Sequence, residues 1–217
     1  SVPVAGRLIS RGVSSAAALT FLLAAPAINP IVLISTAVAF PGAPEMVIAR
    51  LVASFLTAVV VGSIWSRFVS EDVLEQRLSE YLDRSHAHRF METAVHDFLQ
   101  AGGFLVMGAA LVATMQTVVP QSTLDAIGGQ GLVGVLALAG LAVLLSICSE
   151  ADAFVAAGLT QFSLTARLAF LVVGPMVDVK LVALQVAAFG RRFAVRFAPL
   201  TFTVAVTVSL VVGSVLL

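Results

Sequence analysis

Lys180, the one lysine in the chain, follows Asp178 by two residues inside an apolar run from Leu168 to Ala188. A charged side chain at membrane depth costs roughly 2.5 kcal/mol or more unless it is paired or faces water. Gly174 and Pro175 come shortly before the two charges and would break a helix at that depth. This pattern predicts either a site that binds substrate or carries a proton, or a structural ion pair within the membrane domain.

A second group of reactive side chains follows another apolar run: Cys148, Ser149, Glu150 and Asp152. The Cys148 thiol could bind a soft ligand, while Glu150 and Asp152 could carry protons or bind a cation. In the alternative interpretation, Cys148 is a small buried hydrophobic residue and the two acids lie at the membrane interface. Ser149 could expose its hydroxyl or cap a helix.

The remaining polar candidates are interpreted more conservatively. Arg167 could pair with one of the nearby carboxylates or extend to the membrane interface. The three histidines, His86, His88 and His96, lie in a polar segment far in sequence from Cys148. That separation argues against an intramembrane enzyme with a cysteine nucleophile and a histidine base. The sequence therefore predicts no catalytic residues, no metal site and no cofactor.

Composition sets the class of protein. The 217 residues are 59% hydrophobic and 11% charged, whereas soluble domains carry about 25% charged residues. We therefore expect a polytopic protein whose partners are the lipid bilayer, a small-molecule or ion substrate, and either a second copy or a partner membrane subunit. Zero net charge gives no indication of nucleic-acid binding. The sequence begins without methionine and ends within an apolar run, so we expect a longer natural chain.

The elements that must position these residues are apolar runs long enough to cross a bilayer. Two of the runs are interrupted by proline. Between them lies a polar segment, read as a cytoplasmic amphipathic helix or linker because it carries four arginines. The predicted fold is an all-α transmembrane bundle, with a first repeat core in residues 1–66 (broken helix 13–40, helix 46–66), a polar segment 67–97, and a second repeat in 98–217 (helices 98–119, 131–148 and 201–217, broken helix 163–190).

The two proline-interrupted runs match each other at an offset of 149 residues. Ser14 aligns with Ser163, Pro26 with Pro175, and Asn29 with Asp178. We predict an internal duplication, with the substrate path between the two broken segments. Asn29 could donate to a substrate oxygen or serve as a turn or cap residue.

The direction of the repeats depends on whether each broken segment returns as a re-entrant hairpin or continues across the membrane. Three unbroken helices, 46–66, 98–119 and 131–148, are predicted between the two broken segments. With this number, hairpins would make the two halves inverted and crossings would make them parallel. The distribution of arginines favours hairpins, because it then gathers seven on the side of the polar segment and leaves Arg7, Arg11 and Arg50 on the other.

Three stretches carry a resemblance to a known family. They are Ile-Cys-Ser-Glu-Ala-Asp-Ala-Phe-Val-Ala-Ala at 147–157, Gly-Pro-Met-Val-Asp-Val-Lys-Leu at 174–181, and Phe-Leu-Leu-Ala-Ala-Pro-Ala-Ile-Asn-Pro at 21–30. The chain resembles the predicted-permease family that includes the organoarsenical efflux permeases (ArsP-like). The resemblance implies a multi-pass permease of the inner (cell) membrane, in a family whose characterised members export trivalent organoarsenicals.

Together these features predict a permease that exports a small soft or organometalloid solute by gradient-coupled alternating access. No nucleotide-binding Gly-x-x-x-x-Gly-Lys-Ser/Thr motif occurs in the sequence. The alternatives are a non-transporting membrane subunit of a larger complex, or a permease for a metal ion or another small solute. The residues predicted to form the path are Asn29, Pro26, Cys148, Ser149, Glu150, Asp152, Pro175, Asp178 and Lys180.

Overall fold

The computed structural model describes residues 12–65 and 131–217 continuously, with Arg67 and scattered positions elsewhere. Every regular element in these two ranges is an α-helix, which confirms the predicted all-α class. The polar segment 67–97, with its three histidines, lies outside the described residues except for isolated positions. The predicted helix 98–119 is likewise described only at scattered positions, each of them helical.

The first proline-interrupted run forms two helices. Helix α2 (Ser15–Ala27) ends one residue after Pro26, and α3 (Pro30–Ala39) begins at the next proline. Pro30 suits the first turn of a helix because its missing N–H would have no partner there. After a short turn, α4 (Pro44–Trp65) runs back along the bundle.

The second half repeats this order. Helix α10 (Leu164–Met176) ends one residue after Pro175, α11 (Val179–Phe189) follows, and α12 (Arg191–Leu216) starts after Gly190. Gly190 has φ 89°, a backbone conformation that side chains with a Cβ rarely adopt, so it permits the sharp change of direction. The predicted breaks in both segments are confirmed.

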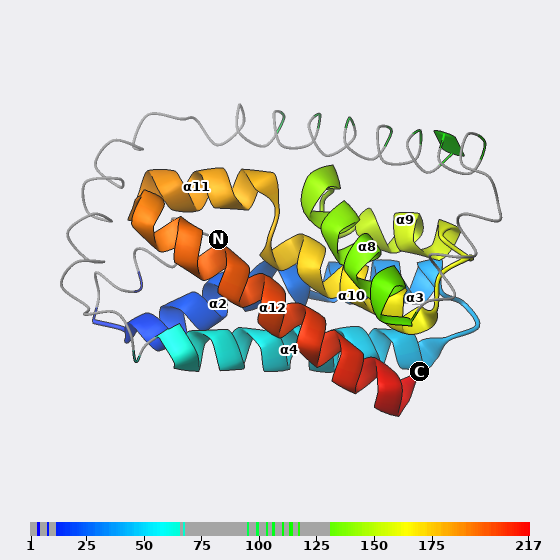
Figure 1. The fold of residues 1–217 in the computed structure, drawn as a ribbon, viewed down its shortest axis with the longest axis horizontal. Helices are drawn as coiled ribbons and strands as arrows, with labels where there is room; N and C mark the ends of the chain where they lie inside the picture. The colour runs from blue at the N-terminus through cyan, green and yellow to red at the C-terminus, as the bar shows by residue number, and fades with distance from the viewer. Residues whose placement is uncertain are drawn as a thin grey trace.

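Neither broken segment folds back on itself. Residues Ala16–Ala39 and Leu164–Phe189 are each long and apolar enough to cross a membrane as one unit. In Figure 1, α2 leads into α3 from left to right, whereas α10 leads into α11 from right to left. The first residues of α2 and α10 lie 149 positions apart, as do those of α3 and α11. Each broken helix therefore continues in one direction, whereas the sequence analysis favoured hairpins, and the two broken helices run in opposite directions, as the inverted arrangement expects.

A shorter pair of helices explains why the directions are opposed. Helix α8 (Gly131–Leu145) ends three residues earlier than predicted, and the residue that follows it, Ser146, has φ 47°. A residue in this left-handed region cannot continue a right-handed helix. After the bend at residues 146–151, α9 (Asp152–Gly158) leads back to the right-hand end of the molecule, where α10 begins. Helix α8 therefore starts, and helix α9 finishes, at the same end of the molecule.

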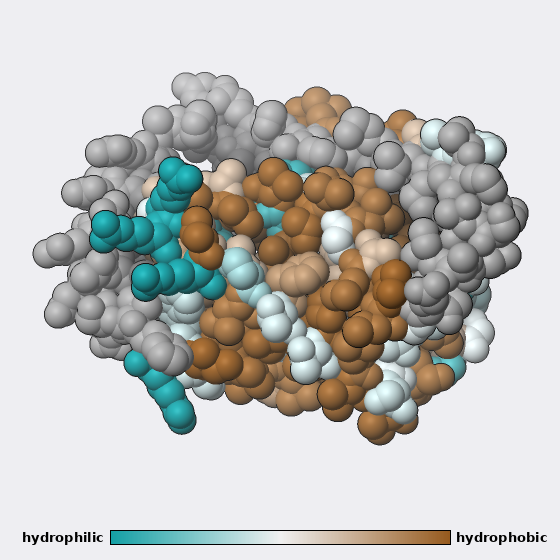
Figure 2. Space-filling view, in the orientation of Figure 1, coloured by the Kyte–Doolittle hydropathy of each residue, from teal (hydrophilic) through white to brown (hydrophobic). Residues whose placement is uncertain are grey.

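The helices pack around α10, whose residues from Leu168 to Met176 are all buried. Helix α10 contacts α8 and α12, α4 contacts α2 and α12, and α3 contacts α4 and α9. Large apolar side chains are exposed on the outer faces, among them Ile34, Phe55 and Leu144. Figure 2 shows apolar residues over the middle of one face and hydrophilic ones at its left end, where α11 meets α12 in Figure 1. This distribution suits a surface surrounded by lipid.

Candidate functional site

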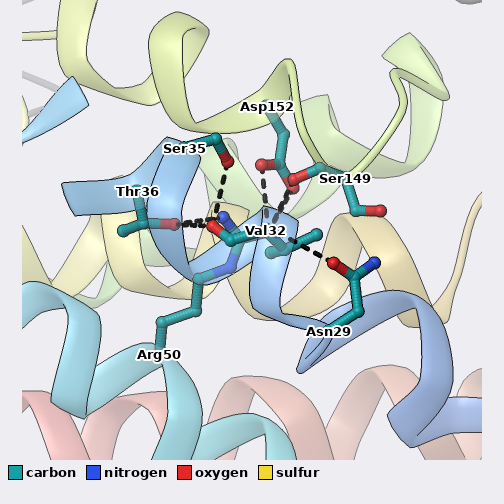
Figure 3. Close-up of polar contacts among 7 residues, drawn as sticks. All are labelled: Asn29, Val32, Ser35, Thr36, Arg50, Ser149 and Asp152. Carbon is teal, nitrogen blue, oxygen red and sulfur yellow. Dashed lines mark hydrogen bonds and ion pairs between the residues drawn. The ribbon is translucent and has the colours of Figure 1, made fainter. Parts of the chain in front are cut away.

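The charge at the centre of the described structure is Arg50, whose side chain is 0% exposed. It lies six residues into α4, and apart from Glu45 it is the only charged residue of that helix. Its Nη2 donates to both carboxylate oxygens of Asp152, at 3.0 Å to Oδ1 and 2.8 Å to Oδ2. The same nitrogen lies 3.1 Å from the Ser149 carbonyl oxygen. Figure 3 shows this arrangement.

The other end of the guanidinium is held by α3. Arg50 Nη1 donates to Thr36 Oγ1 at 2.7 Å, and Thr36 Oγ1 donates in turn to the Val32 carbonyl oxygen at 2.7 Å. Val32 N donates to Asn29 Oδ1 at 2.9 Å, so Asn29 caps α3. The cap, the first turn of α3 and the arginine thus form one continuous hydrogen-bonded chain (Figure 3).

The carboxylate is presented by the bend between α8 and α9. Asp152, 3% exposed, is the first residue of α9. Its backbone N and that of Ala151 both donate to the Cys148 carbonyl oxygen, at 3.1 and 3.0 Å, which fixes the tight turn. A Cβ placed on Gly174 of α10 would lie 3.9 Å from Asp152 Oδ2, so α10 passes close behind the carboxylate.

The same bend also reaches the break between α10 and α11. Val179 N, at the start of α11, donates to Ser146 Oγ at 3.1 Å, and Ser146 Oγ lies 3.2 Å from the Val143 carbonyl oxygen. Residues 146–152 therefore contact the second broken helix through Ser146 and, through Arg50, the first.

A buried charge pair of this kind is costly to form and more costly to break. Removing two ions from water costs several kcal/mol per ion, which their mutual attraction offsets only with good geometry and further hydrogen bonds. Here Thr36 and the Ser149 carbonyl supply those further bonds. The arrangement holds α3, α4 and α9 together, and it can be released only if water, a proton or a substrate charge replaces one of the partners.

The predicted path residues divide into two groups in the structure. Ser149 and Asp152 contact Arg50 directly, and Asn29 is linked to it through Val32 and Thr36. Cys148 is a free, half-buried thiol in the same bend, and Glu150 is partly exposed beside it. These five predicted residues belong to one region around the guanidinium.

The second group lies at the helix breaks. Pro26 and Pro175 are each the residue before the last of their helix. Asp178 caps α11, with Leu181 N donating to its Oδ1 at 2.5 Å, and Lys180, the second residue of that helix, is partly exposed. The structure thus shows that Asp178 makes a capping bond. A role of Asp178 and Lys180 in transport stays a prediction.

For two arginines the structure adds contacts that the sequence interpretation did not include. Arg167 donates to the Phe162 and Thr160 carbonyl oxygens, at 3.0 and 2.9 Å, and so closes the loop between α9 and α10 instead of pairing with a carboxylate. Arg50 was not among the predicted site residues. The signal that could have found it is an isolated arginine between Met46 and Trp65 in an otherwise apolar helix.

Comparison with known proteins supports a permease. The chain matches the family described as "Predicted permease" over residues 1–214. It is 33% identical over 221 residues to a putative two-component membrane permease complex subunit of Streptococcus mutans, covering 98% of this chain and 73% of that protein. It is 38% identical over 205 residues to the UPF0718 protein YcgR of Bacillus subtilis, covering 88% of this chain and 68% of that protein.

No solved structure matches the chain. The resemblance noted from the sequence is confirmed by the family match, and the names of the relatives point to a transporter rather than an enzyme. Four described segments are long and apolar enough to span a membrane. The chain therefore belongs to the predicted-permease family and is a multi-pass membrane permease.

Proposed function

We propose that the protein moves a small solute by gradient-coupled alternating access, and that the Arg50–Asp152 pair is the switch of the transport cycle. The observation that supports this proposal is the burial of both charges, Arg50 at 0% and Asp152 at 3% exposure, where α3, α4 and the 146–151 bend meet. Intramembrane ion pairs facing the interior of a bundle commonly mark substrate or proton pathways.

Protonation gives the switch a physical mechanism. A proton on Asp152 removes its negative charge and weakens its bonds to Arg50, because the Coulomb attraction between the carboxylate and the guanidinium is lost. The released guanidinium could then meet water or substrate while α9 separates from α3 and α4. The breaks at Ile28–Asn29 and Val177–Asp178 provide points where these helices can bend.

The proposed cargo is a small soft or organometalloid solute such as a trivalent organoarsenical, moved outward. Support comes from the Cys148 thiol, which is half-buried, not disulfide-bonded and four residues before Asp152. Thiolates prefer soft ions, and one thiolate supplies a single such bond. Family membership is the second support.

The test is substrate-dependent flux into everted vesicles, with and without a proton gradient, across a panel of trivalent organoarsenicals and divalent metals. The variants are Asp152→Asn, Arg50→Lys and Cys148→Ser, with Glu45→Gln as the control because Glu45 is an exposed acid of the same helix as Arg50. Only variants that insert and remain monodisperse in detergent are compared.

We expect Asp152→Asn to lose gradient-driven flux, Arg50→Lys to reduce it at least tenfold, and Glu45→Gln to retain it. Cys148→Ser should lose flux of soft solutes alone. Gradient-driven flux that survives in a well-folded Asp152→Asn protein would overturn the switch. Flux of arsenicals that is unaffected by Cys148→Ser would overturn the role of the thiol.

A second function is favoured by one comparison. The Streptococcus mutans relative is named as a subunit of a two-component membrane permease complex. We propose as the alternative that this chain is the membrane subunit of such a complex and transports only with its partner. Co-purification of a stoichiometric partner, with flux restored on adding it to an inactive chain, would favour this alternative. A second copy as the only partner would argue against it.

The orientation in the membrane is also a proposal. Arg67 follows the end of α4, and Arg191, Arg192 and Arg196 are exposed in the first turns of α12. An excess of arginine marks cytoplasmic ends, so we place this end and the polar segment 67–97 in the cytoplasm. Reaction of a cysteine introduced at Arg192 with an impermeant reagent in everted vesicles, but not in intact cells, would support the placement, and the reverse would overturn it.

A further inference from the structure

Helix α4 carries three polar side chains on one buried face. Arg50, Ser54 and Thr57 are spaced i, i+4 and i+7, and each is 0% exposed. In the described part of the chain, Arg50 Nε, Ser54 Oγ and Thr57 Oγ1 have no hydrogen-bond partner. A buried polar group without a partner loses its hydrogen bonds to water and gains none in return, so a row of three needs a physical reason.

Several other hydroxyls in the same bundle donate to the backbone of their own helix. Thr36, Thr201 and Ser214 donate to carbonyl oxygens three or four residues earlier in their own helices, at 2.7, 2.9 and 2.8 Å. This bond is available to any serine or threonine in an apolar helix. Ser54 and Thr57 do not make it, so both hydroxyls keep their capacity to donate and accept inside the bundle.

The helix packed against α4 has a similar residue at a similar depth. Ser209 Oγ of α12 is buried and also lacks a partner among the described residues. The Trp65 ring, at the end of α4, lies 5.2 Å from the Phe197 ring of α12, and the two helices run in opposite directions. Ser54 is about 16 Å before Trp65 and Ser209 about 18 Å after Phe197, at 1.5 Å per residue.

We infer that Ser54 and Thr57 line a narrow aqueous path along α4 that connects solvent to the Arg50–Asp152 pair. Its ligand is water and the protons that water carries. Thr57 and Arg50 are about 10 Å apart along the helix, a length that roughly three or four hydrogen-bonded waters would bridge. Arg50 Nε ends the row, while its two Nη atoms are held by Asp152 and Thr36.

The purpose of this path rests on the proposed function, since a proton-driven switch at a buried carboxylate needs aqueous access. The existence of the path is independent of the proposed function, because water beside Ser54 and Thr57 can be detected without any transported substrate. The experiment can therefore separate the two proposals.

The test uses Ser54→Cys and Thr57→Cys, each made in a Cys148→Ser protein so that it carries the only thiol of the chain. A membrane-impermeant methanethiosulfonate is applied to intact cells and to everted vesicles. The reagent modifies thiolates, which form only in contact with water. Ala53→Cys and Ala58→Cys are the matched controls, because both positions are 0% exposed and adjoin the row on the same helix.

We expect modification at positions 54 and 57 at least tenfold faster than at 53 and 58, from at least one side of the membrane. Equally slow reaction at all four positions would overturn the path. Equally fast reaction at all four would also overturn it, by showing a loosely packed helix. Selective labelling, together with a wild-type protein that moves no solute of the panel, would leave the path standing and count against the proposed function. Flux by the wild-type protein without selective labelling would count against the path alone.

Discussion

Asn29 and Asp178 cap α3 and α11 through the same bond. Each side chain accepts, through Oδ1, the backbone N–H of the residue three positions later, Val32 at 2.9 Å and Leu181 at 2.5 Å. Both follow a helix whose residue before the last is proline. One cap is neutral and the other is a carboxylate, so the capping bond does not require the negative charge of Asp178.

Replacing Asp178 can therefore separate capping from charge. We expect Asp178→Asn to keep the stability of the wild type and Asp178→Ala to lose about 1 kcal/mol, since asparagine caps as well as aspartate does and alanine does not. Thermal unfolding of the purified protein in detergent measures both. If Asp178→Asn is stable but loses flux, the charge acts in transport; if it is as unstable as Asp178→Ala, the shared capping role is wrong.

The Arg50–Asp152 pair predicts strong coupling between two distant mutations. Arg50→Met and Asp152→Asn should each destabilise the protein by about 3–5 kcal/mol, because each leaves a buried polar partner uncompensated. The double variant should lose less than the sum of the two singles by at least about 1 kcal/mol. Denaturant unfolding in micelles, over a complete double-mutant cycle, supplies the four values. Simple additivity would show that the ion pair contributes no coupling to stability.

Local rules predicted the breaks in the two long helices but could not predict what they position. Proline, glycine and a following Asn or Asp act on their own backbone, so Pro26 and Pro175 indicate the ends of α2 and α10 from the sequence alone. Arg50 pairs with a residue 102 positions away. No spacing rule relates two such residues, so from the sequence Arg50 contributes only to the distribution of positive charge on the two sides of the membrane.

The end of α8 illustrates a second limit. Apolar composition continues beyond Leu145, so the sequence predicts helix to Cys148, yet Ser146 takes a positive φ and its hydroxyl accepts from Val179 N, 33 positions later. A tertiary hydrogen bond thus coincides with a break that helix propensity does not indicate. The start of α12 was missed for the opposite reason, since the arginines at 191, 192 and 196 look like a loop but occupy its first two turns.

Gly62 predicts a close contact between α2 and α4. A Cβ at this position would lie 2.1 Å from Thr20 Oγ1 and 2.9 Å from the Ala16 carbonyl oxygen. The hydroxyl could rotate away but the carbonyl belongs to the backbone of α2, so we expect Gly62→Ala to destabilise the protein by about 1–3 kcal/mol. Thermal unfolding in detergent measures the loss.

Gly140→Ala is the matched control for this contact. Gly140 is also within a helix, and a Cβ there would meet nothing within 4 Å among the described residues. Alanine has the higher helix propensity, so Gly140→Ala should be neutral or stabilising by up to about 1 kcal/mol. Equal effects of the two substitutions would mean that α2 and α4 do not approach closely at Gly62.

Trp65 offers a direct spectroscopic test of how α4 packs against α12. It is the single tryptophan of the 217 residues, it is 6% exposed, and its ring lies edge-on to Phe193 and Phe197 at 5.0 and 5.2 Å. We expect blue-shifted emission that iodide quenches weakly in detergent.

Phe197→Ala should shift the Trp65 emission to the red and destabilise the protein by about 3–5 kcal/mol, because it opens a cavity against the indole. Phe202→Ala, in the same helix but partly exposed, should leave the emission unchanged. Strong iodide quenching of the wild-type protein would show that the end of α4 is not packed against α12, and would remove the contact from which the depth of Ser209 was inferred.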